Sequence, residues 1–263
     1  MTKLYRGGKK GLRLHQDGIA ALKDIPDDFK LTDNQEIQRQ AAMTGEPHVN
    51  KPAIARFLKR IKFPVSYLDF ETFGTAIPLF DGLRPYQQVP FQFSLHVQRS
   101  KDAELEHHSF LADGKTDPRP EFMRCLRNVL PRQGSVLAFN APFELGRLRE
   151  CSELLPAFRP CVAGIERRIV DLLLPFRRFH YYHPKQNGSA SMKAVLPALT
   201  GHRYEQLAIQ DGGMASLEFL RVAFVDVGEE ERRRVWKQLE EYCGQDTMGM
   251  AWIVDALRRL AES

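Results

Sequence analysis

The pattern of apolar and polar positions predicts a sheet of mixed direction flanked by helices. Residues 65–72 begin as a run of β-branched and aromatic side chains without a breaker, and residues 134–139 form a second short apolar run. Residues 91–98 alternate apolar and polar side chains, as a half-exposed strand does, and residues 106–112 are placed to pair with it as a hairpin. Because strands alternate with helical segments after an antiparallel pair, we expect an α/β fold.

The first part of the chain reads as a helical lead-in. Thr32 and Gln35 have the spacing of a capping box and open a helix. Pro52 suits the first position of a second helix, which Pro64 ends before the first strand. We therefore expect residues 1–62 to be a partly helical lead-in, with the character of a linker from an upstream domain.

Helical patterns dominate the rest of the chain between and after the strands. Residues 117–130 and 142–155 are helical segments beside the second apolar run. Residues 229–242 and 246–260 predict a mostly helical C-terminal part. One domain over residues 63–263 accommodates all of these elements.

Two carboxylates interrupt the first predicted strand. Asp69 and Glu71 lie two residues apart, so their side chains point to the same face of the strand. Adjacent carboxylates on an apolar strand repel each other and resist burial. A divalent cation between them would remove that conflict, because hard cations prefer carboxylate oxygen. The alternative is a strand end that reaches solvent, and the pattern alone does not decide between the two.

Further polar residues that could contribute to a metal site follow the second predicted strand and occur in the C-terminal helix. Asn140 and Glu144 come directly after the strand at 134–139, at the sheet edge where open α/β sheets bind ligands. A helix N-cap and an acid in a first helical turn explain them equally well. Tyr242 and Asp246 are four residues apart, so a helix would present both on one face.

Composition narrows the class of protein without choosing a function. The chain has 263 residues, 43% of them hydrophobic and 27% charged, and no window long and apolar enough for a membrane span. The basic first residues lead into no apolar segment, so we expect a cytoplasmic protein without a membrane partner. Four cysteines without a CxxC pair predict reduced thiols rather than zinc or redox chemistry. A net charge of +5 favours a polyanionic partner only mildly.

Taken in order, these motifs resemble those of the DnaQ-like (DEDD, tyrosine-type) exonucleases of the ribonuclease H-like fold, over about residues 63–260. Finer matches resemble the domain-of-unknown-function family numbered 2779. They are Leu68–Thr72, Arg84–Gln88, Phe143–Glu144, Ile169–Leu172, Lys193–Pro197 and Tyr242–Thr247. Members of that family often carry this domain behind a RecB- or Cas4-like nuclease domain. The resemblance implies such a partner in cis or trans, and a chain that is a C-terminal piece or a stand-alone copy of one.

The resemblance implies hydrolysis of a phosphodiester with two Mg²⁺ or Mn²⁺ ions. The implied metal ligands are Asp69, Glu71, Glu144 and Asp246, and Tyr242 would orient the attacking water. Because no His or Cys accompanies the acids, we expect hard ions. The second exonuclease motif normally ends in aspartate, so Glu144 departs from the pattern. Asp171 is the possible substitute for it as the fourth acid.

A substrate-binding set is expected around this site. Thr72 and Phe73 are placed to touch a terminal nucleotide. The segment from 177 to 185 interleaves positive and aromatic side chains, which suits single-stranded nucleic acid, although its aromatic rings would serve equally as core. The full set also includes Asn140, Arg177, Arg178, Tyr181, Tyr182, Lys185 and Lys193.

The expected function is therefore an enzyme, a 3′→5′ exonuclease acting on a single-stranded 3′ end of DNA or RNA. One alternative is a module of the same fold with an inactive site that binds nucleic acid or a partner protein. Another is a different two-metal phosphoesterase, such as a structure-specific endonuclease or a small-nucleotide hydrolase.

Overall fold

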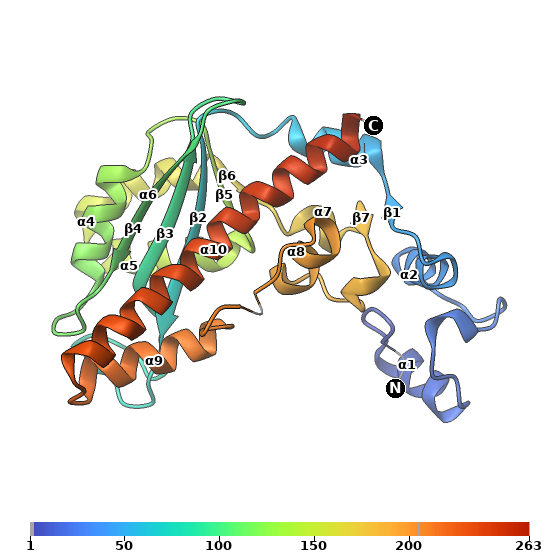
Figure 1. Cartoon of the computed structure of the whole chain (residues 1–263), viewed down its shortest axis with the longest axis horizontal. Coiled ribbons are helices and arrows are strands. Elements are labelled where there is room, and N and C mark those ends of the chain that lie inside the picture. The colour runs from blue at the N-terminus through green and yellow to red at the C-terminus, as the bar shows by residue number, and fades with distance from the viewer. Residues whose placement is uncertain (1–2, 205, 263) are drawn as a thin grey trace. The chain divides into compact units, whose positions relative to one another are not determined.

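The computed structural model of the chain describes residues 3–204 and 206–262 (Figure 1). These residues form two compact units. Residues 61–172 and 204–251 make up the larger unit, and residues 3–60, 173–203 and 252–262 make up the smaller one. The change of unit after residue 60 lies close to the boundary expected at residue 62. Residues 173–203, which were expected in the second domain, pack with the N-terminal residues.

The larger unit is built on a five-stranded sheet. Its strands are β2 (Val65–Phe73), β3 (Val89–Gln98), β4 (Leu105–Leu111), β5 (Ser135–Ala138) and β6 (Ile169–Asp171). Their order across the sheet is β4-β3-β2-β5-β6; β2, β3 and β4 are antiparallel neighbours, whereas β5 runs parallel to β2 and β6. The expected α/β fold with a mixed sheet is confirmed, including the hairpin of β3 and β4.

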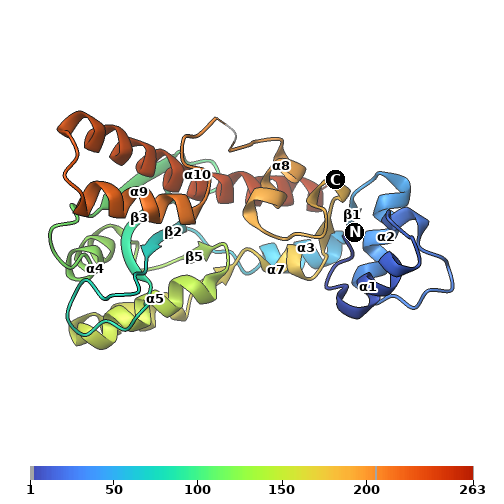
Figure 2. The same ribbon diagram turned by 90° about the horizontal axis from the view of Figure 1, so that it is seen from below.

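Helices cover both faces of this sheet, as Figure 2 shows. The helices on one face are α4 (Arg119–Val129), α5 (Ala141–Leu154) and α6 (Arg159–Glu166). On the opposite face lie α9 (Gly212–Phe224) and the long C-terminal helix α10 (Glu229–Glu262), of which residues 229–251 belong to this unit. Leu68 and Phe70 of β2 pack with Phe122 of α4 and Leu148 of α5 in the core below the first face. The expected helical C-terminal part is confirmed. The two segments expected at residues 229–242 and 246–260 form one continuous helix, α10.

The polar residues of the alternating pattern in β3 face helix α10. Every residue of β3 is buried, so the expectation of a half-exposed strand was wrong. The amide of Gln92 donates to the carbonyl of Leu239, at 2.9 Å. The hydroxyl of Ser94 and Nδ1 of His96 each lie 2.7 Å from the hydroxyl of Thr247. The polar face of β3 therefore binds α10 rather than solvent.

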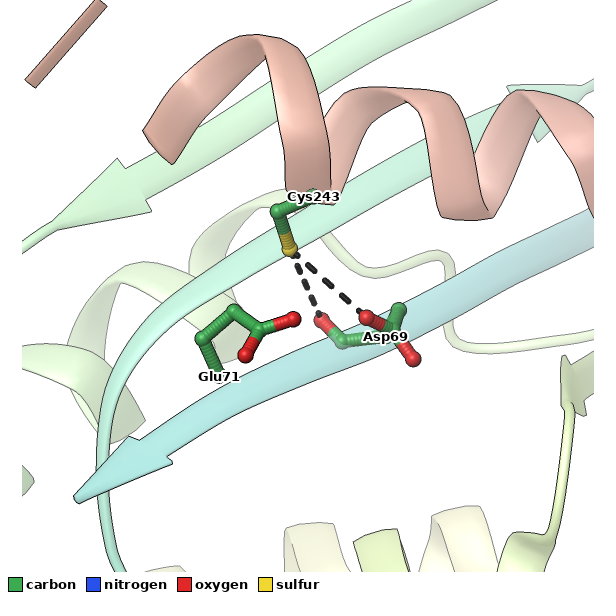
Figure 3. Close-up of side chains that lie close together, drawn as sticks. All are labelled: Asp69, Glu71 and Cys243. Atoms are coloured by element: carbon green, nitrogen blue, oxygen red, sulfur yellow. Dashed lines mark hydrogen bonds between the residues drawn. The ribbon is translucent and has the colours of Figure 1, made fainter. Parts of the chain in front are cut away.

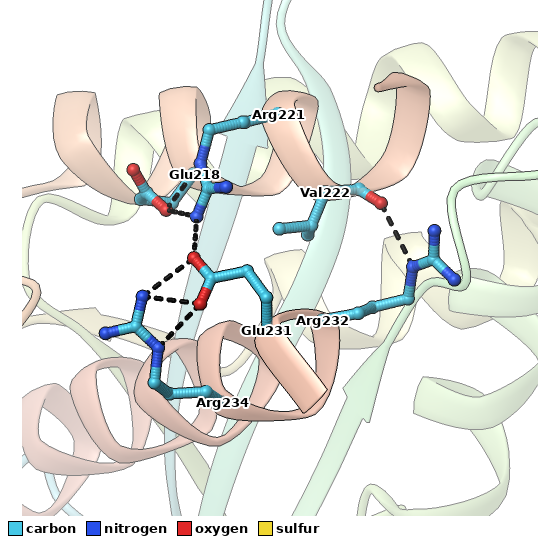
Figure 4. Close-up of polar contacts among 6 residues, drawn as sticks. All are labelled: Glu218, Arg221, Val222, Glu231, Arg232 and Arg234. Carbon is cyan, nitrogen blue, oxygen red and sulfur yellow. Dashed lines mark hydrogen bonds and ion pairs between the residues drawn. The ribbon is translucent and has the colours of Figure 1, made fainter. Parts of the chain in front are cut away.

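A small network of ion pairs joins α9 to the first turn of α10 (Figure 4). Nη2 of Arg221 lies 2.7 Å from a carboxylate oxygen of Glu218 on its own helix and 2.7 Å from Glu231 on α10. Nε of Arg234 donates to the same Glu231 carboxylate, at 2.8 Å. These side chains are partly exposed, so the energy of each pair is small. The network helps to place α9, whose first turn borders the site described below.

The smaller unit is mainly helical. Its elements are α1 (Gly8–Gln16), α2 (Asp33–Thr44), β1 (His48–Val49), α3 (Lys51–Leu58), α7 (Leu174–Arg177), β7 (Tyr181–Tyr182) and α8 (Met192–Thr200). The predicted capping box of Thr32 and Gln35 is present at the start of α2. Strands β1 and β7 form an antiparallel pair. Within the parts of the chain that the structure describes, no helix has the length and apolar character needed to cross a bilayer.

Candidate functional site

Strand β2 delivers the first two acids to the α10 side of the sheet. Side chains alternate along a strand, and Leu68 and Phe70 occupy the core on the opposite face. Asp69 and Glu71 consequently both point toward α10, as Figure 3 shows. Glu71 is buried, with 5% of its surface exposed. The predicted pairing of these two carboxylates on one face is confirmed, and both lie within β2, with Asp69 half-buried, rather than at a frayed strand end.

Helix α5 brings the third acid. The chain leaves β5 and turns at Asn140, which has a left-handed backbone with φ 88° and ψ 53°. The backbone N–H of Asn140 donates to Oδ1 of Asp171, at 3.1 Å. Glu144 follows in the first turn of α5 and is buried. Its Oε2 has no hydrogen-bond partner among residues 3–204 and 206–262.

Helix α10 contributes the remaining predicted residues. Tyr242 and Asp246 lie one turn apart, and both are buried. The hydroxyl of Tyr204 donates to Oδ1 of Asp246, at 2.6 Å. Tyr204 comes from the segment before α9, far from Asp246 in the sequence. A phenol from another segment of the chain thus holds this carboxylate.

These residues line one pocket of about 460 Å³ in the larger unit. The members that the sequence predicted are Asp69, Glu71, Thr72, Asn140, Glu144, Tyr242 and Asp246. The first turn of α9 closes one side with Gly212, Gly213 and Ser216. A Cβ on Gly212 would lie 3.3 Å from Oε2 of Glu71, so the glycine permits a close approach of the helix.

Burial and mutual repulsion disfavour simultaneous ionisation of the four carboxyl groups in the pocket. Burial raises the pKa of Asp69 well above its usual value, and the neighbouring Asp246, Glu71 and Glu144 carboxylates raise it further. Burial raises the pKa of Glu144 to about 8, and nearby Asp171 adds to the increase. Carboxyl groups with raised pKa values at one site hold protons unless cations replace them. The arrangement therefore suits bound cations.

The surroundings of Tyr242 also determine its protonation state. Burial, followed by the charges of Asp246, Glu71 and Asp69, raises the pKa of its phenol. The hydroxyl thus keeps its proton at neutral pH and acts as a hydrogen-bond donor or acceptor, not as a phenolate.

The side chain of Cys243 lies beside two of these acids. Ligand atoms of Asp69, Glu71 and Cys243 all lie within 4.8 Å of one another. Sγ of Cys243 lies 3.8 Å from Oδ2 of Asp69, and the sulfur is directed toward β2 (Figure 3). The expectation that no cysteine accompanies the acids was wrong. All four cysteines are free thiols, as expected, but this one faces carboxylates because it follows Tyr242 on α10.

Phe73 has a role different from the one expected. Phe73 is buried and stacks on Phe219 at 5.6 Å between ring centroids, so it is not available to a nucleotide. Phe143, by contrast, is half-buried and lines the pocket. Asp171 does not line the pocket and holds the backbone of Asn140 instead. Of the two acids, Glu144 is the one that lines the pocket.

The remaining predicted substrate residues lie in the smaller unit. Tyr181 and Tyr182 are buried there in β7, so their rings are not available to stack on bases, and that expectation was wrong. The hydroxyl of Tyr181 donates to the carbonyl of Ala198. The exposed basic residues of this set are Arg177, Arg178, Lys185 and Lys193.

Comparisons with known proteins find a family of unknown function and uncharacterized relatives, and they name no activity. Residues 66–191 match the family described as a domain of unknown function (DUF2779). The match supports this family assignment. It includes Asp69, Glu71 and Glu144, and it ends before Tyr242 and Asp246.

Two mycoplasma proteins are similar over most of the chain. An uncharacterized protein MG366 homolog of Mycoplasma pneumoniae is 24% identical over 214 residues, covering 73% of this chain and 32% of that protein. The uncharacterized protein MG366 of Mycoplasma genitalium is 24% identical over 213 residues, with 74% and 32% covered. The chain thus spans about a third of the length of these relatives. No solved structure matches the chain significantly.

Proposed function

We propose that this chain is a metal-dependent 3′→5′ exonuclease of the ribonuclease H-like fold that acts on DNA or RNA. The observation that carries the proposal is the convergence of four acids and a tyrosine, from β2, α5 and α10, in one pocket. They are Asp69, Glu71, Glu144, Asp246 and Tyr242. The order of these residues along the chain is the order that the resemblance to tyrosine-type exonucleases implies.

The position of the pocket on the sheet supports the proposal. Asp69 and Glu71 lie toward the carboxyl end of β2, and Glu144 follows the carboxyl end of β5, which runs parallel to β2. Open sheets bind ligands outside the carboxyl ends of their parallel strands. The antiparallel β2-β3-β4 part beside parallel β5 and β6 is compatible with a ribonuclease H-like fold.

The donor set fits divalent metal ions. Oε2 of Glu144 is buried and has no hydrogen-bond partner among the described residues, and the pKa of Asp69 is raised, so the negative charge of both carboxylates is poorly compensated. The carboxylates of Asp69, Glu71, Glu144 and Asp246 would hold two Mg²⁺ or Mn²⁺ ions. Such ions, when bound, supply an activated water and stabilise the oxygen that leaves the phosphorus. A phosphodiester is itself anionic, so the uncompensated acids would repel it.

The chain's own residues would orient the reactants. The protonated hydroxyl of Tyr242 is available to hold the attacking water, and Tyr204 fixes the carboxylate of Asp246 beside it. At the pocket wall, the ring of Phe143 has the guanidinium of Arg147 at 5.1 Å from its centroid. That ring is the aromatic surface on which a terminal base would stack. Thr72, whose hydroxyl bonds Gln88 at 2.7 Å, borders the same space.

A gel time course tests the proposal. Single-stranded DNA and RNA carrying a 5′ label are incubated with Mn²⁺, Mg²⁺ or EDTA, and parallel strands carry the label at the 3′ end. We expect a descending ladder from the 5′-labelled strand, mononucleotide from the 3′-labelled strand, and neither in EDTA. Asp246→Asn should abolish both products, whereas Glu241→Gln, an exposed acid on the same helix, should not. Internal cuts in both strands would indicate an endonuclease, and absence of cleavage in every metal would contradict the proposal.

A further inference from the structure

The thiol of Cys243 lies close to two carboxylates, those of Asp69 and Glu71. Its Sγ is 3.8 Å from Oδ2 and 3.9 Å from the backbone carbonyl oxygen of Asp69 (Figure 3). The thiol is completely buried between α10 and β2. A cysteine that serves only for packing is a small hydrophobic group with apolar neighbours. Here the sulfur is directed at the strand segment that carries two acids.

We propose that this pocket also binds a thiophilic divalent ion, with Zn²⁺ as the biological occupant, through Cys243, Asp69 and Glu71. The ion takes the place of the thiol proton, which leaves to solvent, so that a sulfur–metal bond replaces a sulfur–hydrogen bond. The inference rests on the metal site of the proposed function but not on nuclease activity. Hard Mg²⁺ uses only the oxygen ligands, whereas zinc uses sulfur and oxygen together.

The distances fit this set of ligands. Zinc bonds of about 2.3 Å to sulfur and about 2.0–2.2 Å to carboxylate oxygen, at a tetrahedral angle, separate sulfur from oxygen by about 3.6 Å. The observed separation of Sγ and Oδ2 in Asp69 is 3.8 Å. All three ligand atoms lie within 4.8 Å of one another, so modest side-chain rotation brings Glu71 to the same centre.

The pocket gives a metal ion access to these ligands and offers a further carboxylate to bind it. Asp69 and Glu71 form part of the pocket wall, so an ion in the pocket reaches both carboxylates, and Sγ of Cys243 lies 3.8 Å from Oδ2 of Asp69. A second observation is independent of the cysteine. Glu144 lines the same pocket with a buried Oε2 that has no hydrogen-bond partner in the described part of the chain. A fourth ligand is therefore available at the open side of the ion.

The consequence is a choice between two kinds of metal at one site. Three protein ligands including a thiolate give Zn²⁺ a much higher affinity than an oxygen set gives Mg²⁺. Because both kinds of ion need Asp69 and Glu71, their binding is mutually exclusive. Zinc at this position is thus a competitor of the ions proposed for hydrolysis, and Cys243 is the residue that distinguishes them.

Spectroscopy of the full chain with Co²⁺, which replaces zinc and is visible, tests the inference without any nuclease assay. We expect a thiolate-to-cobalt charge-transfer band in the near ultraviolet that saturates stoichiometrically and is removed by Zn²⁺. The band should be absent in Cys243→Ser and retained in Cys125→Ser and Cys161→Ser, whose thiols pack against the core on the α4 and α6 side of the sheet. Zinc affinity should fall in Cys243→Ser by at least about 10-fold, the smallest loss usual when even an outer partner of a metal ligand is removed.

X-ray absorption at the zinc edge of the wild-type protein gives a second reading that needs no variant to fold. The inference expects one sulfur neighbour at about 2.3 Å together with oxygen neighbours at about 2.0 Å. A first shell of oxygen alone, or a cobalt band that persists in Cys243→Ser, would overturn it. Thiolate-bound cobalt in a protein that cleaves no nucleic acid would instead overturn the proposed function and support this inference.

Discussion

The hydroxyl of Tyr204 donates a hydrogen bond of 2.6 Å to Oδ1 of Asp246. Both residues are buried. Burial and then the charge of Asp246 raise the pKa of Tyr204, so its phenol keeps its proton. Asp246 at the same time lines the pocket. Outer partners of this kind set the orientation of a ligand carboxylate and strengthen metal binding.

Replacing Tyr204 by phenylalanine should therefore weaken metal binding while the fold persists. We expect the Mn²⁺ affinity of Tyr204→Phe to fall by about 10- to 100-fold, because Asp246 loses a donor that orients it. Electron paramagnetic resonance of free Mn²⁺ during a titration measures this affinity. Tyr181→Phe is the matched control, since that buried tyrosine bonds Ala198 in the smaller unit. Equal affinities in the two variants would contradict the role given to Tyr204.

The stability of the metal-free protein should fall as pH rises. The pKa of Glu144 is about 8 in the folded state against 4.5 ordinarily. Between these values the unfolded chain releases this proton and the folded chain keeps it, so increasing pH favours unfolding. The free energy of unfolding in EDTA should decrease by a few kcal/mol, on the order of the pKa difference, between pH 4.5 and pH 8.

Urea unfolding at a series of pH values checks this dependence. Glu144→Gln should show a distinctly smaller decrease, because glutamine has no proton to keep. Glu241→Gln, on the exposed side of α10, should retain the wild-type decrease. The same slope in Glu144→Gln as in the wild type would show that the pocket acid does not govern the dependence.

Thr247 of α10 makes two of the polar contacts between α10 and β3. Its hydroxyl lies 2.7 Å from both Ser94 and His96. Burial, with His107 and His108 nearby, lowers the pKa of His96 to about 4. The imidazole is therefore neutral at pH 7, and the hydroxyl of Thr247 is its hydrogen-bond partner.

Thr247→Val keeps the shape of the side chain but leaves two buried polar groups without this partner. We expect a loss of about 2–4 kcal/mol in the free energy of unfolding. Thr44→Val, at an exposed position of α2, should change it by less than about 0.5 kcal/mol. Thermal and urea denaturation compare the two variants. A similarly small effect at both threonines would mean that the buried network contributes little.

The sequence predicted those parts of the site that depend on local periodicity. Asp69 and Glu71 share a face because strands alternate, and Tyr242 and Asp246 share one because a helix turns in 3.6 residues. These relationships hold wherever the element forms. The strand and helix positions followed from the same periodicities and were largely correct.

Features that depend on contacts between distant segments escaped prediction. Tyr204 reaches Asp246 across 42 residues, and no spacing rule joins them. The pairing of β2 with β3 shifts register between Glu71 and Thr72, and Phe73 beyond this shift packs against Phe91 and Phe219. Tyr182 likewise stacks on Phe179 inside the smaller unit, although exposed Arg178 and Lys185 lie close by in the sequence.

The most direct test of the central claim is the single-turnover rate at which the protein removes the 3′-terminal nucleotide of a single strand in saturating Mn²⁺. Asp69→Asn removes the charge at the centre of the pocket, and Asp102→Asn makes the same change in the exposed turn after β3. The account predicts that Asp69→Asn lowers the rate by at least about 100-fold, since metal ions contribute several kcal/mol to such reactions. Asp102→Asn should match the wild type. Equal rates in all three proteins would contradict the account.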